Sequence, residues 1–370
     1  MTQAPVRQRG FAARIEPYGR ALLVLEDGTQ FDGISVGAAG TAVGEAVFTT
    51  SMTGYQEALT DPSFHGQLVC FTAPMVGNYG VAPERTQSPR ARAAGALMRS
   101  CTSRCWSTWL REEGVVAIAD IDTRRLAMHL REHGSMRAVV SSSPDALDGP
   151  GRDGLAARAA QLEPTDWATV IAEVSTPSRY LHADGERDVA VLDLGVKRSL
   201  LQLIERNGCA VTVYPHDVDT ATLRNHQAVV VSSGPGDPAR LDGYLRTIVP
   251  LLGEVPMLGV CLGHQLLARA LGHDTWKLPF GHRGTNHPVL DRRTGRVLVT
   301  SQNHGYAVAI GSAGAEVTHV SLYDGTVEGF ACRELRVAGI QFHPEATPGP
   351  DDARGLVADW LQEYTGAAQA

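Results

Sequence analysis

The chain has 370 residues, a length typical of two domains rather than one. Hydrophobic residues make up 43% of the sequence and charged residues 20%, which are the proportions of a globular protein. The net charge of −7 leaves no basic surplus that would favour nucleic acid or anionic lipid, although small anionic metabolites are not excluded as ligands.

The longest apolar runs, such as residues 228–231 and 255–258, are far shorter than the roughly 20 residues that cross a bilayer. The first ten residues lack the apolar segment of a secretory signal, and six scattered cysteines do not indicate a disulfide framework in a chain of this length. We therefore expect no membrane contact and a cytoplasmic location.

Residues 22–143 contain short apolar or alternating segments separated by turn residues, which predicts mostly β-structure. One amphipathic helix is expected near the end of this region, where Asp122 can cap it and Gly134 can end it. The sequence then becomes rich in Ser, Pro, Asp, Gly and Ala, as connecting regions are. We predict an amino-terminal domain over residues 1–150 and a linker over residues 151–186.

From residue 188 onward, apolar strand-like segments alternate with amphipathic helical ones. This order predicts an α/β domain over residues 187–370, with a mainly parallel central sheet flanked by helices. Ligands of such sheets bind beyond the carboxyl ends of the strands, so reactive residues are expected in the turns that follow them.

The clearest candidate is Cys261 in the segment Gly-Val-Cys-Leu-Gly, residues 259–263. A nucleophile flanked by glycines between a strand and a helix can stand on a sharp, exposed corner. The helix N-terminus there favours a thiolate, and the N–H of Leu262 can face a developing oxyanion. A buried structural cysteine is the alternative interpretation.

A cysteine nucleophile needs a base, and the base needs a partner that orients it. His343 and Glu345 follow the apolar segment 337–342, and their spacing can place both side chains on one side of an extended chain. The turn Ser-Gly-Pro-Gly-Asp-Pro, residues 233–238, follows another apolar segment, and its backbone N–H groups can complete an oxyanion hole.

These three segments, GVCLGHQLLA, SSGPGDP and QFHPEA, together resemble the class I glutamine amidotransferases. The resemblance implies Cys261 as the nucleophile, His343 as the acid and base, and Glu345 as its orienting carboxylate. It also implies attack on the side-chain amide of glutamine, a thioester intermediate, release of ammonia and hydrolysis to glutamate.

The first half resembles the amino-terminal domain of the carbamoyl-phosphate synthase small-subunit family, through segments such as LVLEDGTQFDGISVG and TSMTGYQEALTDPSFHGQLVCFTAP. This resemblance implies a large synthetase subunit as the partner in a heterodimer, which uses ATP and Mg²⁺ to make carbamoyl phosphate for arginine and pyrimidine biosynthesis. We expect no cofactor and no metal in this chain, which has no G-x-x-x-x-G-K-[ST] phosphate loop.

Carried over position by position, the glutamine contacts of the family fall on residues of several segments. They are Ser51, Gly234, Gly236, Leu262, Gln265, Asn303, Gly305 and Tyr306. Two positions depart from the family pattern: Tyr306 stands where phenylalanine is frequent, and Ser199 replaces a usual asparagine.

Residues 82–115 look shorter and less regular than the family pattern, which leaves contacts with the partner open. Zinc binding by Cys101, Cys105, His129 and His133 is a weak alternative, because the interval is long and both histidines fall in a predicted helix. Three other functions are considered: the glutaminase of an anthranilate, GMP or CTP synthase, a non-catalytic assembly module, and a cysteine hydrolase or protease. Residues 20–143 disfavour the first, the retained cysteine, histidine and glutamate disfavour the second, and no sequence feature supports the third.

Overall fold

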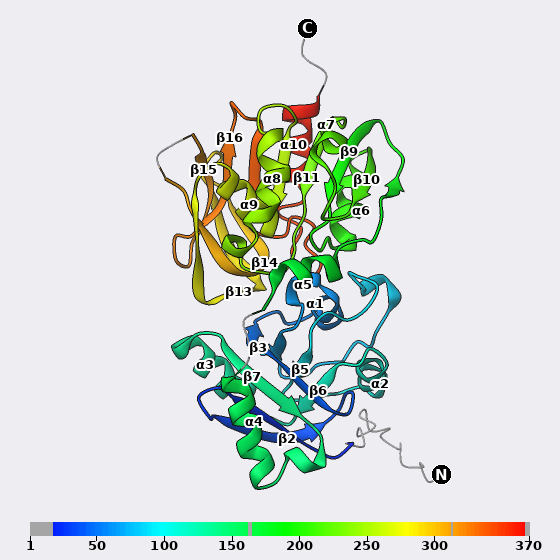
Figure 1. Cartoon of the computed structure of the whole chain (residues 1–370), viewed down its shortest axis with the longest axis vertical. Coiled ribbons are helices and arrows are strands. Elements are labelled where there is room, and N and C mark those ends of the chain that lie inside the picture. The colour runs from blue at the N-terminus through cyan, green and yellow to red at the C-terminus, as the bar shows by residue number, and fades with distance from the viewer. Residues whose placement is uncertain (1–17, 162–164, 312–313, 367–370) are drawn as a thin grey trace, which may run out of the picture.

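The computed structural model describes residues 18–161, 165–311 and 314–366, which form two halves stacked along the long axis of the molecule (Figure 1). The first ten residues, which the sequence predicts not to be a signal segment, lie outside the described residues. Within those residues the strands form a closed barrel in the first half and a 10-stranded sheet in the second.

The barrel is built from short strands in the order β1-β2-β6-β5-β4-β3-β7. Their bounds are β1 (Arg20–Leu25), β2 (Gln30–Ser35), β3 (Thr41–Thr49), β4 (Leu68–Phe71), β5 (Gly95–Leu97), β6 (Val116–Ala119) and β7 (Met136–Ser141). The neighbours β3, β4, β5 and β6 pair in parallel, and β1 pairs antiparallel with β2 and β7. Alternate residues such as Leu23, Leu68 and Ile118 belong to one buried cluster that fills the barrel.

Four helices pack on this barrel: α1 (Tyr55–Thr60), α2 (Arg104–Glu112), α3 (Thr123–His133) and α4 (Pro150–Ala160). The predicted helix near Asp122 is α3, whose N-cap side chain accepts a bond from the N–H of Arg125. The irregular segment 82–115 contains both β5 and α2, and Trp106 of α2 is fully buried against Tyr55. This segment is therefore an integral part of the first half.

The predicted linker, residues 151–186, contains most of α4, then α5 (Trp167–Val174) and β8 (Tyr180–Ala183). Strand β8 pairs with β10 at the edge of the large sheet, so that sheet begins before the predicted start at residue 187. Strand β8 lies at the edge of the sheet, and its side chains are exposed or half-buried. Its sequence therefore has no alternating apolar pattern from which a strand could be predicted.

The large sheet has the order β14-β13-β15-β16-β17-β12-β11-β9-β10-β8. The remaining strands are β9 (Arg187–Leu192), β10 (Cys209–Tyr214), β11 (Ala228–Val231), β12 (Met257–Val260), β13 (Asp274–Asp291), β14 (Val297–Ala309), β15 (Glu316–Ser321), β16 (Val327–Cys332) and β17 (Val337–Ile340). Strands β10, β9, β11, β12 and β17 are parallel, and those beyond β17 are antiparallel. The parallel centre is what the strand and helix alternation predicts.

Helices cover both faces of the parallel strands (Figure 1). They are α6 (Arg198–Arg206), α7 (Thr220–Arg224), α8 (Leu245–Ile248), α9 (Leu262–Ala270) and α10 (Gly355–Thr365). Alternate residues of β11 divide between two cores, since Val229 and Val231 pack with α9 whereas Val230 packs with α6 and α10. This burial on both faces explains the continuous apolar runs of these strands.

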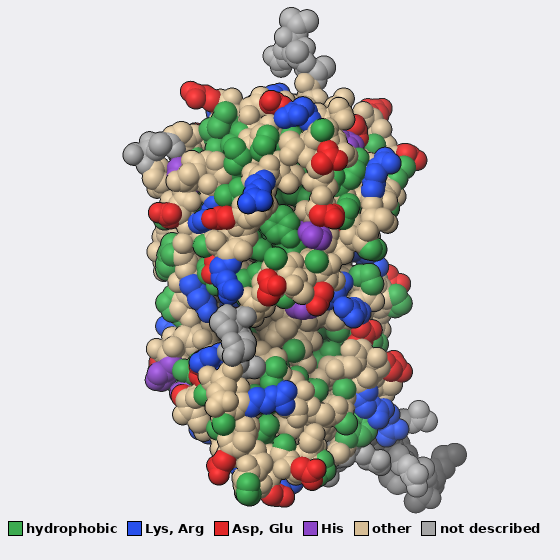
Figure 2. All heavy atoms as spheres, viewed as in Figure 1, with side chains coloured by type: hydrophobic (Ala, Val, Ile, Leu, Met, Phe, Trp, Pro, Cys, Tyr) green, Lys and Arg blue, Asp and Glu red, His purple; other side chains and the backbone are tan. Residues whose placement is uncertain are grey.

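The two halves meet through specific polar contacts as well as packing. Thr50 donates its backbone N–H to the carbonyl of Arg283 at 3.0 Å, and the Ser199 hydroxyl donates to Gln87 Oε1 at 2.7 Å. The serine at position 199, whose role the sequence left open, therefore joins the halves. On the face shown in Figure 2, basic and acidic side chains are interspersed with apolar ones.

Among the described residues, no helix is both long enough and apolar enough to span a bilayer.

Candidate active site

Cys261 occupies a sharp corner between β12 and α9, where its backbone adopts φ 54° and ψ −104°. Such a conformation is strained for a residue other than glycine. The corner requires glycine on both sides: a Cβ at Gly259 would lie 2.4 Å from the Gly263 carbonyl, and one at Gly263 would lie 2.0 Å from the Val231 carbonyl. The flanking glycines therefore let α9 pack directly against the strands.

Behind the cysteine lies a buried chain of three side chains, His343, Glu345 and Lys197. His343 Nδ1 is 2.8 Å from Glu345 Oε1, and Lys197 Nζ is 2.8 Å from the same oxygen. His343 Nε2 is buried without a hydrogen-bond partner, and the Cys261 side chain is near enough to influence the proton on the ring. The structure thus brings together the three residues that the sequence predicts for catalysis.

The charges of His343, Glu345 and Lys197 determine the protonation state of each of these three side chains. Burial alone would lower the pKa of His343, but the Glu345 carboxylate outweighs it and raises the pKa of the imidazole to about 10. Burial would raise the pKa of Glu345, yet Lys197 and His343 hold it well below its usual range. Burial would likewise lower the pKa of Lys197, but Glu345 and Asp61 raise it. The site therefore favours an imidazolium beside the cysteine.

Backbone N–H groups of two segments lie near the corner. Leu262 is the first residue of α9, so its N–H has no acceptor in its own helix. The turn after β11 packs against the same corner: a Cβ at Gly234 would lie 3.0 Å from the Leu262 side chain, and Gly234 and Gly236 line the same cavity as Cys261. Backbone groups that close packing holds in place in this way can bind a developing negative charge.

Cys261 opens into a cavity of about 670 Å³ between the two halves. Six of the predicted glutamine contacts line this cavity: Gly234, Gly236, Gln265, Asn303, Gly305 and Tyr306. Cys261 Sγ lies 3.6 Å from the carbonyl of Asn303, and Gln265 Nε2 donates to the carbonyl of Tyr306 at 2.9 Å. Leu262 does not line the cavity with its side chain, but its backbone follows Cys261 directly.

Ser51 also lies outside the cavity lining, where it hydrogen-bonds with Thr49, so its contact with glutamine stays a prediction. Ser63, which the sequence did not predict, lines the cavity, and its Oγ is buried without a hydrogen-bond partner. It stands in the turn after α1, where the carboxylate of Asp61 accepts its N–H at 2.9 Å. The sequence carried one signal for it: the Asp-Pro-Ser segment after a short helix is typical of a rigid turn.

Sequence reasoning also missed Lys197 and Asp61. Lys197 follows β9 and is only 2% exposed, although lysine is almost never fully buried unless paired. Asp61 accepts a bond from Asn303 Nδ2 at 3.0 Å, which connects the first half to the cavity wall. The position of Lys197 after a parallel strand was the available signal.

The residues of the weak zinc alternative have other partners. His129 lies 2.6 Å from Asp27, and His133 Nδ1 lies 3.0 Å from the carbonyl of His129. Cys105 is exposed, with its sulfur beside the Ser103 hydroxyl.

Comparison with known proteins identifies both halves. The family model described as carbamoyl-phosphate synthase small chain, CPSase domain, matches residues 23–140, and the one described as glutamine amidotransferase class-I matches residues 190–362. A carbamoyl phosphate synthase small chain of Akkermansia muciniphila is 43% identical, over 92% of this chain and 96% of its own. Those of Solidesulfovibrio magneticus and Clostridium perfringens are 43% and 40% identical, over 90% and 93% of this chain and 96% and 99% of their own.

The chain belongs to the carbamoyl phosphate synthase small-chain family.

Membership of this family confirms both resemblances and the predicted α/β fold class with a mostly-β first half. The small-chain match covers the barrel strands from β1 to β7, and the class I match covers the sheet from β9 to α10. The small-chain match to the first half thereby disfavours the alternative that this chain is the glutaminase of another synthase.

Proposed function

We propose that this chain is the glutamine-hydrolysing subunit of a carbamoyl phosphate synthase, with Cys261, His343 and Glu345 as its catalytic residues. One observation carries the proposal: the strained Cys261 corner opens into the cavity between the halves, with the buried His343 and Glu345 pair behind it. The family relatives at 40–43% identity support the same function.

In the proposed reaction, the Cys261 thiolate attacks the side-chain amide carbon of glutamine while His343 holds the thiol proton. The backbone N–H of Leu262 and those of the turn at Gly234 and Gly236 stabilise the oxyanion. His343 then returns the proton to the leaving nitrogen, which departs as ammonia and leaves a thioester. A water molecule that His343 deprotonates hydrolyses the thioester to glutamate.

The cavity wall offers groups of the kind that a free amino acid requires. Gln265, Asn303, Gly305 and Tyr306 would contact the substrate. Ser51 remains a proposed contact, and Ser63 offers a further hydroxyl in the cavity. Arg283 also lines the cavity, and its buried Nε has no hydrogen-bond partner. Its guanidinium group would therefore be available to bind the α-carboxylate of glutamine. Glu45 lines the same cavity, and its carboxylate, which also pairs with Lys277 at 2.8 Å, supplies negative charge for an α-ammonium group.

We further propose that ammonia passes to a large synthetase subunit, which consumes ATP, Mg²⁺ and bicarbonate and forms a heterodimer with this chain. In this scheme glutamine hydrolysis itself needs no cofactor. The carbamoyl phosphate would enter arginine and pyrimidine biosynthesis in the cytoplasm.

The test mixes this chain with the large subunit of its organism and measures carbamoyl phosphate formation from glutamine and from ammonia. We expect Cys261→Ser to abolish the glutamine-dependent reaction, because a serine hydroxyl is a far weaker nucleophile, and to leave the ammonia-dependent reaction intact. Cys209→Ser, which changes a buried cysteine outside the cavity, is the matched control. Unchanged glutamine use by the Cys261→Ser variant would refute the assignment.

A further inference from the structure

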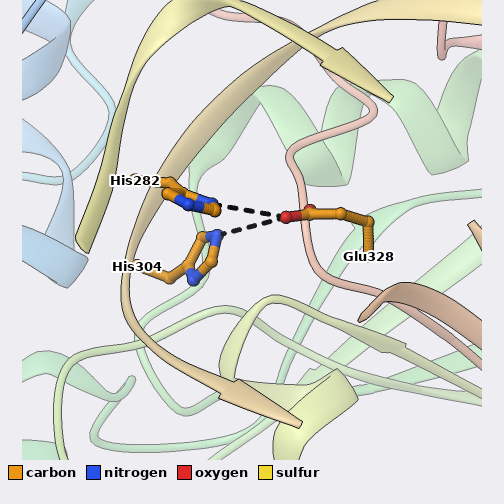
Figure 3. Close-up of side chains that lie close together, drawn as sticks. All are labelled: His282, His304 and Glu328. Atoms are coloured by element: carbon orange, nitrogen blue, oxygen red, sulfur yellow. Dashed lines mark ion pairs between the residues drawn. The ribbon is translucent and has the colours of Figure 1, made fainter. Parts of the chain in front are cut away.

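A second cluster of buried side chains lies in the antiparallel part of the large sheet (Figure 3). His282 of β13, His304 of β14 and Glu328 of β16 converge, and all three are buried. One ligand-type atom from each residue lies within 4.8 Å of the others. No residue of this cluster has a role in the proposed glutamine hydrolysis.

The outer nitrogen of each histidine faces a hydrogen-bond acceptor. His282 Nε2 lies 2.8 Å from a carboxylate oxygen of Asp324, and His304 Nδ1 lies 2.8 Å from the carbonyl of Tyr306. These partners cannot donate, so each outer nitrogen carries the ring proton. In neutral rings the inner nitrogens, His282 Nδ1 and His304 Nε2, carry lone pairs that face Glu328. A second proton on His282, which lies between the carboxylates of Asp324 and Glu328, is the occupant that competes with a cation. Histidines that bind metals are held by outer partners in the same way.

The centre of the cluster lacks donors. His282 Nδ1 is buried without a hydrogen-bond partner, and His304 Nε2 lies 3.0 Å from the amide oxygen of Gln302. The amide nitrogen of Gln302 is already used, because it donates to Glu328 Oε2 at 2.8 Å and to Thr300 at 3.1 Å. Exchanging the amide oxygen and nitrogen of Gln302 would place the oxygen against the Glu328 carboxylate, so the orientation with the nitrogen toward Glu328 is favoured. With neutral rings, lone pairs of the two histidines, of Glu328 and of Gln302 therefore converge on one point. A cation bound there would satisfy them.

We propose that His282, His304 and Glu328 bind a divalent cation of the zinc class. Zinc bonds of about 2.0–2.2 Å in a tetrahedron separate the ligand atoms by about 3.3–3.5 Å. Glu328 Oε1 is 3.4 Å from His282 Nδ1 and 3.9 Å from His304 Nε2, so small side-chain shifts suffice. Gln302 Oε1 is placed to be a fourth ligand. The carboxylates of Glu328 and Asp324 together balance the two positive charges.

The proposed ion has a structural role and revises the expectation that this chain holds no metal. All three ligands are buried, as in structural zinc sites, although His304 also lines the cavity at Cys261. The ion would tie β14 to β13 and β16, and β14 carries Asn303, Gly305 and Tyr306 of the cavity wall. The ion would thus stiffen the wall that faces glutamine.

The experiment measures metal content of the full chain, purified without a histidine tag, by mass spectrometry of the elements. We expect about one zinc per chain, removable by a chelator. Restoring zinc to about a hundred times its Kd should raise the unfolding midpoint by roughly 3–4 °C. Cobalt in the wild-type site should show a tetrahedral visible spectrum without the thiolate bands that cysteine ligands produce.

Variants of the proposed ligands test where the ion binds. Glu328→Gln and His282→Asn should each weaken zinc binding at least about tenfold, and Asp324→Asn should weaken it roughly 10–100-fold through the orientation of His282. His226→Asn is the matched control, because His226 also pairs with a carboxylate, Asp188, but lies elsewhere. Zinc below about 0.1 per chain with no change in the midpoint would show that protons alone hold the cluster. Equal zinc binding by Glu328→Gln and His226→Asn, or thiolate bands with cobalt, would also overturn the proposal.

Discussion

Lys197 is the side chain on which the charge balance of the site depends. It is buried against Glu345 at 2.8 Å and donates to the Thr347 carbonyl at 2.9 Å. Lys197→Met should lower the free energy of unfolding by about 3–5 kcal/mol, because it leaves the Glu345 carboxylate buried with less compensation. Urea unfolding measures this change, and glutaminase activity should fall with it.

The control for Lys197 is Arg224→Met, since Arg224 pairs with Glu254 at the surface, where both side chains are largely exposed. An exposed pair contributes about 0–1 kcal/mol. Equal losses in the two variants would contradict the role assigned to Lys197.

The stability of the protein should also depend on the protonation of His343. Because its pKa is raised to about 10 in the folded chain, against about 6.5 when unfolded, the folded state binds more protons between these values. The contribution of His343 is therefore complete below about pH 6.5 and is lost as the pH rises toward 10.

Urea unfolding of the wild type and of His343→Asn at pH 6.5 and pH 9 tests this sign. We expect the wild type to lose more stability than the variant, since asparagine does not titrate. The same pH dependence in both proteins would show that the ring is neutral in the folded state.

The catalytic positions could be predicted from the sequence because each follows a strongly apolar strand. Ends of parallel strands meet at one edge of a sheet, so Cys261 and His343 were expected together, and the structure places them together. Lys197 follows a strand as well, but its pattern fits equally well the exposed start of a helix. The pairing of Lys197 with Glu345 depends on tertiary packing, which no local pattern reports.

At the scale of elements, the corner between β12 and α9 depends on the absence of side chains. A Cβ at Gly263 would lie 2.0 Å from the Val231 carbonyl, which is backbone and cannot move alone. Gly263→Ala should therefore push α9 away from β11, with a loss of about 1–3 kcal/mol or more and severe loss of glutaminase activity. Thermal unfolding and glutamine turnover measure the two effects.

Gly154→Ala is the matched change in α4, where a Cβ would meet nothing within 4 Å. It should stabilise the protein by about 0.5–1 kcal/mol, because alanine is the better helix former. Tolerance of alanine at both positions would argue against the close packing of α9.

Elements with a strong period were predictable, whereas those defined by distant partners were not. The helix at Asp122 and the strands ending at Cys261 and His343 carry clear patterns. Closure of the barrel pairs Leu22 with Ser141, and β8 is recognisable as a strand only through its pairing with β10. Likewise Ser63 lines a cavity whose wall comes from both halves, so no local pattern could indicate it.

For the molecule as a whole, the two halves should behave as one cooperative unit. The bond from Ser199 Oγ to Gln87 Oε1 is buried and joins α6 to the first half. A double-mutant cycle of Gln87→Ala and Ser199→Ala should show a coupling of about 0.5–3 kcal/mol in the free energy of unfolding. Gln87→Ala combined with the distant Thr220→Ala should be additive within about 0.5 kcal/mol. Additivity in both cycles would show that this bond does not couple the two halves.

The strained backbone at Cys261 has a consequence for evolution in the laboratory. Glycine adopts the observed φ and ψ without the strain that any other residue suffers there. Selection of this chain for heat resistance alone would therefore favour Cys261→Gly and discard the nucleophile. Thermostable lineages should keep the cysteine only where growth depends on glutamine as the nitrogen donor.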